Sequence, residues 1–143
     1  MAGDLNTFAP PPTRVGGYFP LRGYAMVGDS RNCALSSSDG SIDWWTAPTM
    51  SSPPIFGRLL DADRGGHFVV RPQGDFEVAR RYAADSATPE TDFRTSSGLA
   101  WVLDALLDFD DGTTQSAVVR RVVGLHGSVP LSWEIVVGDR FGA

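Results

Sequence analysis

The sequence is short of cysteine, of positive charge and of long apolar segments, and each shortage excludes a class of protein. Cys33 is the only cysteine, so the chain forms no internal disulfide and has no second thiol for a zinc site or a redox pair. Twelve Lys and Arg stand against seventeen Asp and Glu, and the net charge of −5 opposes the basic surface that phosphate contacts need. No apolar run approaches the roughly 20 residues that cross a bilayer. We therefore expect a cytoplasmic protein that binds neither nucleic acid nor membrane.

Motifs for metal binding and catalysis are missing as well. His67 and His126 lie far apart in the sequence without the spacing of zinc ligands, so each is expected to be an ordinary surface or strand histidine. The sequence has no nucleophile elbow, phosphate-binding loop or dinucleotide motif. Carboxylates are abundant, but nothing marks the facing acid pair that glycoside hydrolysis uses. We expect no catalytic residue, no metal and no cofactor in this chain.

What the sequence does contain is a series of short β-branched and aromatic runs, broken by Gly, Pro, Asp and Ser. This rhythm begins at Tyr18 and predicts an all-β fold, an antiparallel β-sandwich in one domain spanning residues 18–143. Residues 1–17 hold Pro10, Pro11, Pro12 and two glycines with few large apolar side chains. Such a segment buries too little surface to offset its ordering entropy, so we expect a flexible leader.

Turn residues between the apolar runs predict which strands pair. The expected strands are Asn32–Leu35 with Ser41–Trp45, His67–Arg71 with Phe76–Tyr82, Thr91–Thr95 with Leu99–Leu107, and Ala117–Val123 followed by Val129–Val137. Gly40 supplies the positive φ of the first hairpin turn, and Asp110-Asp111-Gly112 makes a later turn. Trp133, Ile135 and Val137 alternate with Glu134 in a half-buried pattern.

One segment has helical rather than strand spacing. Its apolar residues recur three to four positions apart just after Pro53-Pro54, and they are Ile55, Phe56, Leu59 and Leu60. Because proline is favoured in the first turn of a helix, we expect one short helix here.

The stretch Asp43-Trp44-Trp45-Thr46-Ala47-Pro48 is the most distinctive candidate site. Adjacent residues of a strand point to opposite faces, so one indole should enter the core while the other faces solvent, a partner or a sugar ring. One core Trp and one interface Trp is the favoured interpretation, and direct stacking on carbohydrate is the alternative.

Two blocks of sequence resemble the opening of bacterial glycoside hydrolase family 15 proteins. The first reads Y-A-M-V-G-D-S-R-N-C-A-L over residues 24–35, and the second reads S-D-G-S-I-D-W over residues 38–44. The family pattern is roughly Y-A-L-I-G-D-x-R-x-A-A-L-V-x-x-D-G-S-I-D-W. Further matches follow at Ser52-Pro53, Phe56, Leu59-Leu60-Asp61, Gly65-Gly66 and residues 120–127.

The resemblance implies a trehalase-like N-terminal domain, a β-sandwich that packs against an (α/α)6 barrel carrying both catalytic glutamates. That barrel is absent from this chain, and Gly142-Ala143 falls where the family's sandwich is still unfinished, so we expect a sandwich truncated at its C-terminal end. The implied function is a non-catalytic domain supporting the barrel of a glucoamylase- or trehalase-like enzyme acting on α-glucan or trehalose. A stand-alone carbohydrate-binding module or a dimerisation sandwich, with a homo-oligomer as its product, is the alternative.

The resemblance also assigns the candidate site. Asp43, Trp44, Trp45 and Pro48 are expected to form a barrel- or sugar-facing loop, with Trp44 in the core and Trp45 facing outward. Thr49 and Ser51 stand where the family has an Arg and an Asp, in its pattern L-C-x-P-R-F-D-S-P. If those charges orient the loop or touch the sugar cleft, their replacement puts the specificity or activity in doubt even with a barrel attached.

Overall fold

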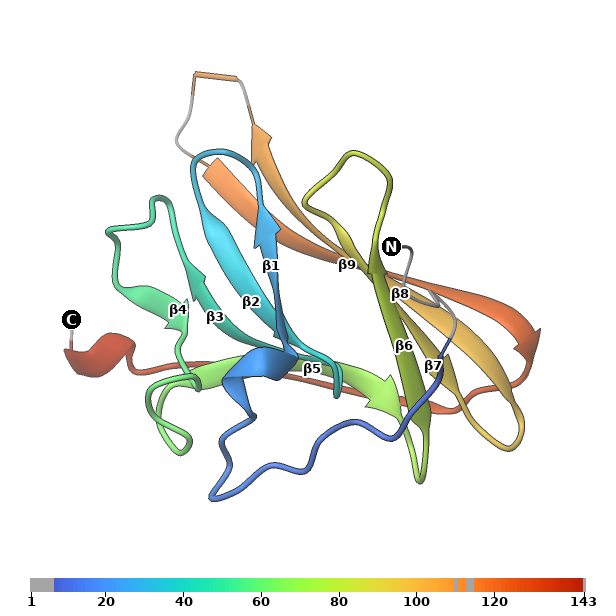
Figure 1. The fold of residues 1–143 in the computed structure, drawn as a ribbon. Helices are drawn as coiled ribbons and strands as arrows, with labels where there is room; N and C mark the ends of the chain where they lie inside the picture. The colour runs from blue at the N-terminus through green and yellow to red at the C-terminus, as the bar shows by residue number, and fades with distance from the viewer. Residues whose placement is uncertain (1–6, 110, 113–114, 143) are drawn as a thin grey trace.

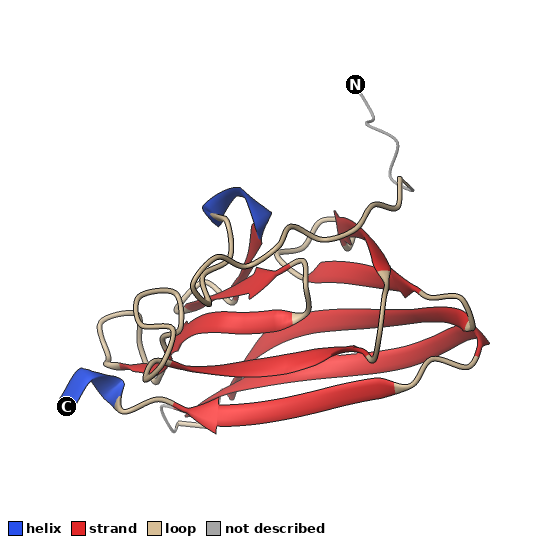
Figure 2. Cartoon of the chain, turned by 90° about the horizontal axis from the view of Figure 1, so that it is seen from below, coloured by secondary structure: helices blue, strands red, loops and turns tan. Residues whose placement is uncertain are grey.

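The computed structural model describes residues 7–109, 111–112 and 115–142. Strands dominate, and the only helical segments described are two short 3-10 turns, η1 (Leu21–Gly23) and η2 (Arg140–Gly142), seen in blue in Figure 2. Two antiparallel sheets face each other, which confirms the predicted all-β sandwich (Figure 1). No helix within the described ranges has the length and apolar character to span a membrane.

The two sheets differ in size. The first sheet has the order β1-β2-β3-β5-β10, with β4 paired to β3, and the second has the order β6-β7-β8-β9. The strands of the first sheet are β1 (Tyr24–Gly28), β2 (Cys33–Ser37), β3 (Ser41–Thr46), β4 (Pro54–Phe56), β5 (Gly66–Pro72) and β10 (Leu131–Val137). Those of the second are β6 (Glu77–Tyr82), β7 (Pro89–Arg94), β8 (Gly98–Phe109) and β9 (Gln115–Gly127).

Two of the predicted hairpins are confirmed. β2 pairs with β3 across the turn that contains Gly40, whose φ is +94°. A Cβ at Gly40 would collide with the carbonyl oxygen of Val70, so both the backbone angle and the space require glycine. β7 pairs with β8, and β8 lies inside the second sheet as its apolar run predicts. Of the predicted turn at Asp110-Asp111-Gly112, Asp110 lies outside the described residues, and Gly112 has a positive φ.

The predicted pairing of the His67 and Phe76 runs is wrong. β5 pairs with β3 and β10, whereas β6 pairs with β7 in the other sheet. The connection around Gly74, which has a φ of +76°, therefore carries the chain from one sheet to the other. Turn residues mark where a strand ends but not which strand it will pair with.

The predicted helix near Pro53-Pro54 is also wrong. Pro54–Phe56 forms β4, in which Phe56 pairs with Trp45, and the chain then turns at Gly57. Phe56 is buried while Leu60 is exposed, so the apolar residues do not form one helical face. Pairing with β3 and packing of Phe56 in the core override the local spacing.

The described part of the leader, residues 7–17, differs from the flexible segment expected. Ala9 and Val78 of β6 exchange backbone hydrogen bonds of 2.8 and 3.1 Å. Farther along, Arg14 reaches the first sheet, where its Nε lies 2.7 Å from a carboxylate oxygen of Asp39. The leader thus crosses from the second sheet to the first (Figure 1). These polar contacts hold it in place, although it has few apolar side chains to bury.

The core combines apolar clusters with buried charges. Phe68 of β5 packs against both apolar clusters, which contain Val27, Ala34, Ile42, Trp45, Phe56 and Leu106 in one and Val70, Val78, Phe93 and Val102 in the other. Asp104 of β8 accepts a 2.7 Å hydrogen bond from Ser36 of β2 and a 2.7 Å bond from Arg120. Arg120 in turn donates to the carbonyl oxygens of Gly40 and Phe68, so a buried ion pair joins the two sheets.

The expected burial of Trp133, Ile135 and Val137 is wrong. Their exposed fractions are 72%, 48% and 64%, because β10 is the last strand of its sheet and nothing in the described chain lies over it. These side chains form an uncovered apolar row on an edge strand.

Candidate functional site

The candidate site begins with an irregularity in β3. Ala34 faces Trp45 and Leu35 faces Trp44, but the next residue of β2, Ser36, faces Ile42. Asp43 is therefore an extra residue on β3, which makes a β-bulge. A bulge shifts the alternation of side chains by one position, so Ile42 and Trp45 lie on the same face of the sheet.

This bulge reverses the predicted assignment of the two indoles. Trp45, with an exposed fraction of 9%, lies in the core and packs against Phe56 with ring centroids 5.8 Å apart. Trp44 lies on the other face and is half-buried. The prediction of opposite faces is confirmed, whereas the prediction that Trp44 enters the core and Trp45 points outward is wrong. Strict alternation from Ile42 favours Trp44 as the buried residue. The extra residue, Asp43, shifts the alternation by one position, so that Trp45 is buried instead.

Asp43 is also buried, with an exposed fraction of 0%. Its carboxylate accepts hydrogen bonds of 2.6 Å from Tyr24 Oη and Ser41 Oγ. It also pairs with Arg14 Nη2 and Arg58 Nε, each at 2.9 Å. Asp43 thus ties the leader and the segment after β4 to β3.

The surroundings of Asp43 set its charge. Burial raises the pKa of a carboxyl group, but here hydrogen bonds from Ser41 and Tyr24 and the charges of Arg58 and Arg14 outweigh burial and lower the pKa of Asp43. Burial and the adjacent carboxylate raise the pKa of Tyr24. Asp43 is therefore an anion held between two cations, which suits it to anchor the fold rather than to exchange protons.

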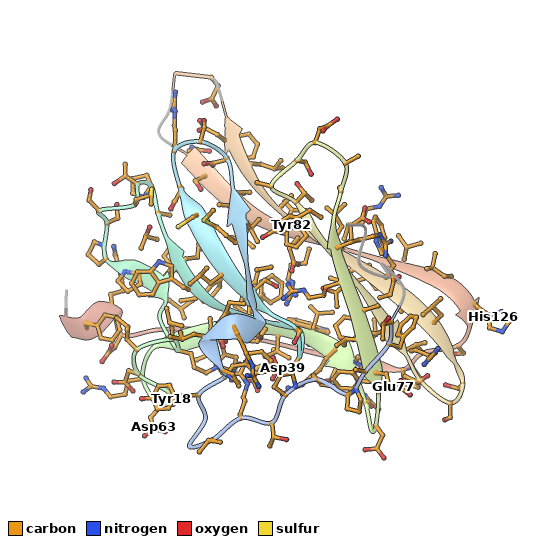
Figure 3. The ribbon with its side chains drawn as sticks, in the orientation of Figure 1. Tyr18, Asp39, Asp63, Glu77, Tyr82 and His126 are labelled. Atoms are coloured by element: carbon orange, nitrogen blue, oxygen red, sulfur yellow. The ribbon has the colours of Figure 1, made fainter. Side chains whose placement is uncertain are left out.

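Arg14, Asp39 and Arg58 complete this buried cluster, and the sequence-based prediction missed all three. Asp39 lies beside the leader in Figure 3, and it accepts hydrogen bonds from Arg14 and, at 3.4 Å, from Arg71. The arginine partners of Asp39 and Asp43 are separated from them by 15 to 32 residues. No local spacing marks such pairs, although Asp43 between Ile42 and Trp44 is an unusual place for a charge in an apolar strand.

Beyond β3, the chain forms a surface loop that starts with Ala47 and Pro48. Ala47-Pro48 is a cis peptide bond, and Pro48 is exposed. The two residues line an open cleft of about 520 Å³, whose other walls come from the tip of the β8–β9 hairpin: Phe109, Gln115, Ser116 and Ala117. Of the four predicted site residues, only Trp44 and Pro48 therefore retain exposed surface.

The hydroxyl groups that replace the family charges close this loop on itself. Ser52 donates its backbone N–H to the carbonyl of Thr49 at 3.1 Å. Thr49 Oγ1 lies 3.1 Å from the hydroxyls of both Ser51 and Ser52. An ST-type turn of this kind is held by short local bonds, so Thr49 and Ser51 have a structural task here that needs no charge.

Each of the three glutamates lies against a basic side chain. Glu77 pairs with Arg94 at 3.0 Å and Glu90 with Arg81 at 2.8 Å. Glu134 Oε1 lies 2.6 Å from Nε2 of His67. Among the described residues, no three of His, Cys, Asp or Glu are grouped closely enough to hold a metal ion. His126 lies at the far end of the sandwich from Asp39 (Figure 3).

Comparison with known families agrees with these features. A family model described as "Trehalase-like, N-terminal" matches residues 17–131, from the end of the leader to the start of β10. The chain belongs to the trehalase-like N-terminal family. The bulged β3 strand and its buried aspartate cluster, with the exception of Arg14, lie inside the matched range.

Individual relatives are similar over most of this chain. It is 35% identical to a trehalase of Mycolicibacterium smegmatis over 141 residues, which cover 92% of this chain and 20% of that protein. It is 34% identical to a trehalase of Mycobacterium tuberculosis over 80% of this chain and 16% of that protein. Trehalase 1 of Sulfolobus acidocaldarius is 32% identical over 85% of this chain and 20% of that protein. This member of the trehalase-like N-terminal family thus spans about a fifth of the relatives it matches. No solved structure matches it.

Proposed function

We propose that this chain is the non-catalytic N-terminal domain of a glycoside hydrolase of family 15, of the glucoamylase or trehalase type. In this role it supports an (α/α)6 barrel that hydrolyses trehalose or another α-glucoside. The family match over residues 17–131 carries the proposal, since the relatives with that sequence are trehalases in which the matching part is about a fifth of the protein.

A chimera tests this role. The segment of the Mycolicibacterium smegmatis trehalase that matches this chain is deleted, and in a second protein it is replaced by this chain. We expect the deletion to abolish soluble, active enzyme and the replacement to restore trehalose hydrolysis. The isolated chain should hydrolyse neither trehalose nor maltose.

A matched pair of variants tests whether the restored activity needs a folded domain and not only an inserted segment of the right length. In the chimera, Trp45→Ala empties part of the core of the domain, whereas Thr49→Ala changes only an exposed loop. We expect Trp45→Ala to remove the restored activity and Thr49→Ala to keep it. A chimera that folds but stays inactive, or an isolated chain that turns over trehalose, contradicts the proposed function.

A stand-alone carbohydrate-binding module is the second candidate, and the Trp44-Trp45 pair gives it little support. Stacking on a sugar ring needs a flat exposed aromatic face, and Trp45 is buried while Trp44 is half-buried. Retention of the isolated chain on an α-glucan column, lost in Trp44→Ala, would favour this candidate.

We also propose a cytoplasmic location. Cys33 is the only cysteine and is a free, partly buried thiol, which is typical of proteins in a reducing compartment. Fractionation of the producing cells, with detection of the chain in the cytosolic fraction, tests this location.

A further inference from the structure

The leader is attached to the sandwich at two separate places. Near its start, Ala9 and Val78 of β6 exchange backbone hydrogen bonds of 2.8 and 3.1 Å. Beside this bridge, the guanidinium of Arg94 lies 4.1 Å from the ring centre of Phe8. Farther along, Arg14 enters the first sheet. The leader, drawn in blue in Figure 1, therefore has one attachment on each sheet.

The attachment at Arg14 fits a guanidinium group in both shape and charge. Arg14 Nε and Nη2 donate to the two carboxylate oxygens of Asp39, at 2.7 and 3.0 Å. Nη2 also lies 2.9 Å from a carboxylate oxygen of Asp43 and 3.2 Å from Ser37 Oγ, and Nη1 donates to the carbonyl of Gly17 at 3.0 Å. The Arg14 side chain is only 16% exposed. Paired hydrogen bonds to one carboxylate need the planar fork of arginine, so a lysine cannot reproduce this contact.

The chain turns sharply just after Arg14. Val15 and Tyr18 exchange backbone hydrogen bonds of 2.9 and 3.0 Å, and Gly16 and Gly17 between them have φ angles of +60° and +88°. A two-residue turn with positive φ at both positions favours glycine. Tyr18 Oη accepts a 3.2 Å hydrogen bond from the loop after β4. This turn has its own attachment to the first sheet, so it supplies a fixed point about which the preceding residues can move.

Three consecutive prolines, Pro10, Pro11 and Pro12, lie between the two attachments. Proline has no N–H and a fixed φ, so this run cannot extend the pairing of Ala9 with β6, and it favours an extended, stiff conformation. A stiff connection that spans two sites holds one end close to its site whenever the other end is bound. The two attachments of the leader should therefore strengthen each other.

We propose that the leader is a strap that opens and closes on the sandwich as one unit, with Arg14 as its latch and the Gly16-Gly17 turn as its hinge. When Arg14 leaves its carboxylate site, the hydrogen bonds between Ala9 and Val78 open with it. The closed strap joins β6 of the second sheet to β3 of the first. The family match begins at residue 17, so the strap precedes the matched range, and the proposal does not depend on the support of a barrel.

Buried charge favours the closed strap. The side chain of Asp43 is 0% exposed and that of Asp39 is 7% exposed. Without Arg14, Asp43 keeps its ion pair with Arg58, but Asp39 keeps only the 3.4 Å contact with Arg71. A buried carboxylate that loses its main cation is strongly destabilised. Arg14 therefore supplies much of the preference for the closed state, and its loss should be detectable at the far attachment.

Amide hydrogen exchange of the 143-residue chain, measured by NMR, tests this coupling. The amides of Ala9 and Val78 donate across the bridge, so they report opening of the far attachment. We expect Arg14→Met to speed exchange at both amides by at least about tenfold. Arg14→Lys should give most of this increase, since lysine keeps the charge but lacks the fork. The matched control is Arg22→Met, which changes an exposed arginine of η1 and should leave both rates unchanged; exchange in β8 checks that each variant keeps its fold.

Trypsin cleavage tests the coupling in the opposite direction, and it also decides the case in which Arg14→Met does not fold. Trypsin binds the arginine side chain in its own pocket, so cleavage after Arg14 requires this side chain to leave its site. Phe8→Ala removes the ring under Arg94 and should speed this cleavage by about two- to fivefold. Leu21→Ala, at an exposed position of η1, should not change it. Replacing Pro10, Pro11 and Pro12 by glycine should reduce the effect of Phe8→Ala.

Three results would overturn the proposal. The first is an Arg14→Met variant in which Ala9 and Val78 exchange at the wild-type rates, since the two attachments would then be independent. The second is a wild-type chain that trypsin cleaves after Arg14 as readily as after the exposed Arg22. The third is a Phe8→Ala variant whose cleavage after Arg14 is no faster than that of the wild type.

Discussion

We expect replacement of Trp45 by alanine to destabilise this domain far more than replacement of Trp44. Trp45 is 9% exposed and packs in the apolar cluster with Ile42 and Phe56. Its Nε1 has no hydrogen-bond partner among the described residues, so the loss is one of packing and not of polar contacts. Truncating a buried Trp or Phe to Ala costs about 3 to 5 kcal/mol. Because a domain is stable by about 5 to 15 kcal/mol, this is a large share of the total.

Urea unfolding followed by far-UV circular dichroism measures both variants at one fixed protein concentration, since any self-association would make the midpoint depend on it. Trp44 is half-buried on the opposite face, and we expect Trp44→Ala to cost less than about 1.5 kcal/mol. Equal losses in the two variants would refute the bulge-based assignment. A larger loss in Trp44→Ala would restore the simple alternation that the sequence favours.

Three further predictions follow from the buried contacts. Gly40→Val should lower the melting temperature, because Gly40 has a φ of +94° and a Cβ there meets Val70; an unchanged melting curve would contradict this turn. Arg120→Met should cost about 3 to 5 kcal/mol in urea unfolding by leaving Asp104 buried without its main partner, and adding Asp104→Asn should recover part of the loss. The pKa of Asp43 is lowered on folding, so its contribution is complete above the unfolded pKa and is lost as the pH falls through the folded pKa. The stability difference between wild type and Asp43→Asn should therefore be constant above about pH 5 and shrink below about pH 4, and a difference that grows on acidification would contradict this sign.

The parts of the fold that the sequence predicts well are those encoded by neighbouring residues. The β2–β3 hairpin follows from Gly40 between two strand-forming runs, and the β7–β8 hairpin from the Ser-Ser-Gly turn before an apolar run. Both the turn and the strands lie within a few residues of each other, so local preferences decide the pairing. The same reasoning fails for β5 and β6, because the turn at Gly74 leads into the other sheet.

The sequence singles out the segment around Asp43 but does not reveal its geometry. A single extra residue at Asp43 exchanges the roles of Trp44 and Trp45, and a bulge leaves no mark on the pattern of apolar residues. The partners of Asp43 come from the leader, from β1 and from the segment after β4. The leader has too few apolar residues to be predicted as ordered. Its ion pair between Arg14 and the buried Asp43 holds it on the first sheet, and amino-acid composition cannot predict such a contact.

For β10, the sequence pattern predicts which face of the strand is apolar but not whether that face is covered. Alternation of Trp133, Ile135 and Val137 against Glu134 indicates correctly which face of the strand is apolar, since their partners Val70 and Phe68 belong to the core face. Whether that face is covered depends on the opposite layer, and in the described chain the second sheet does not extend over it.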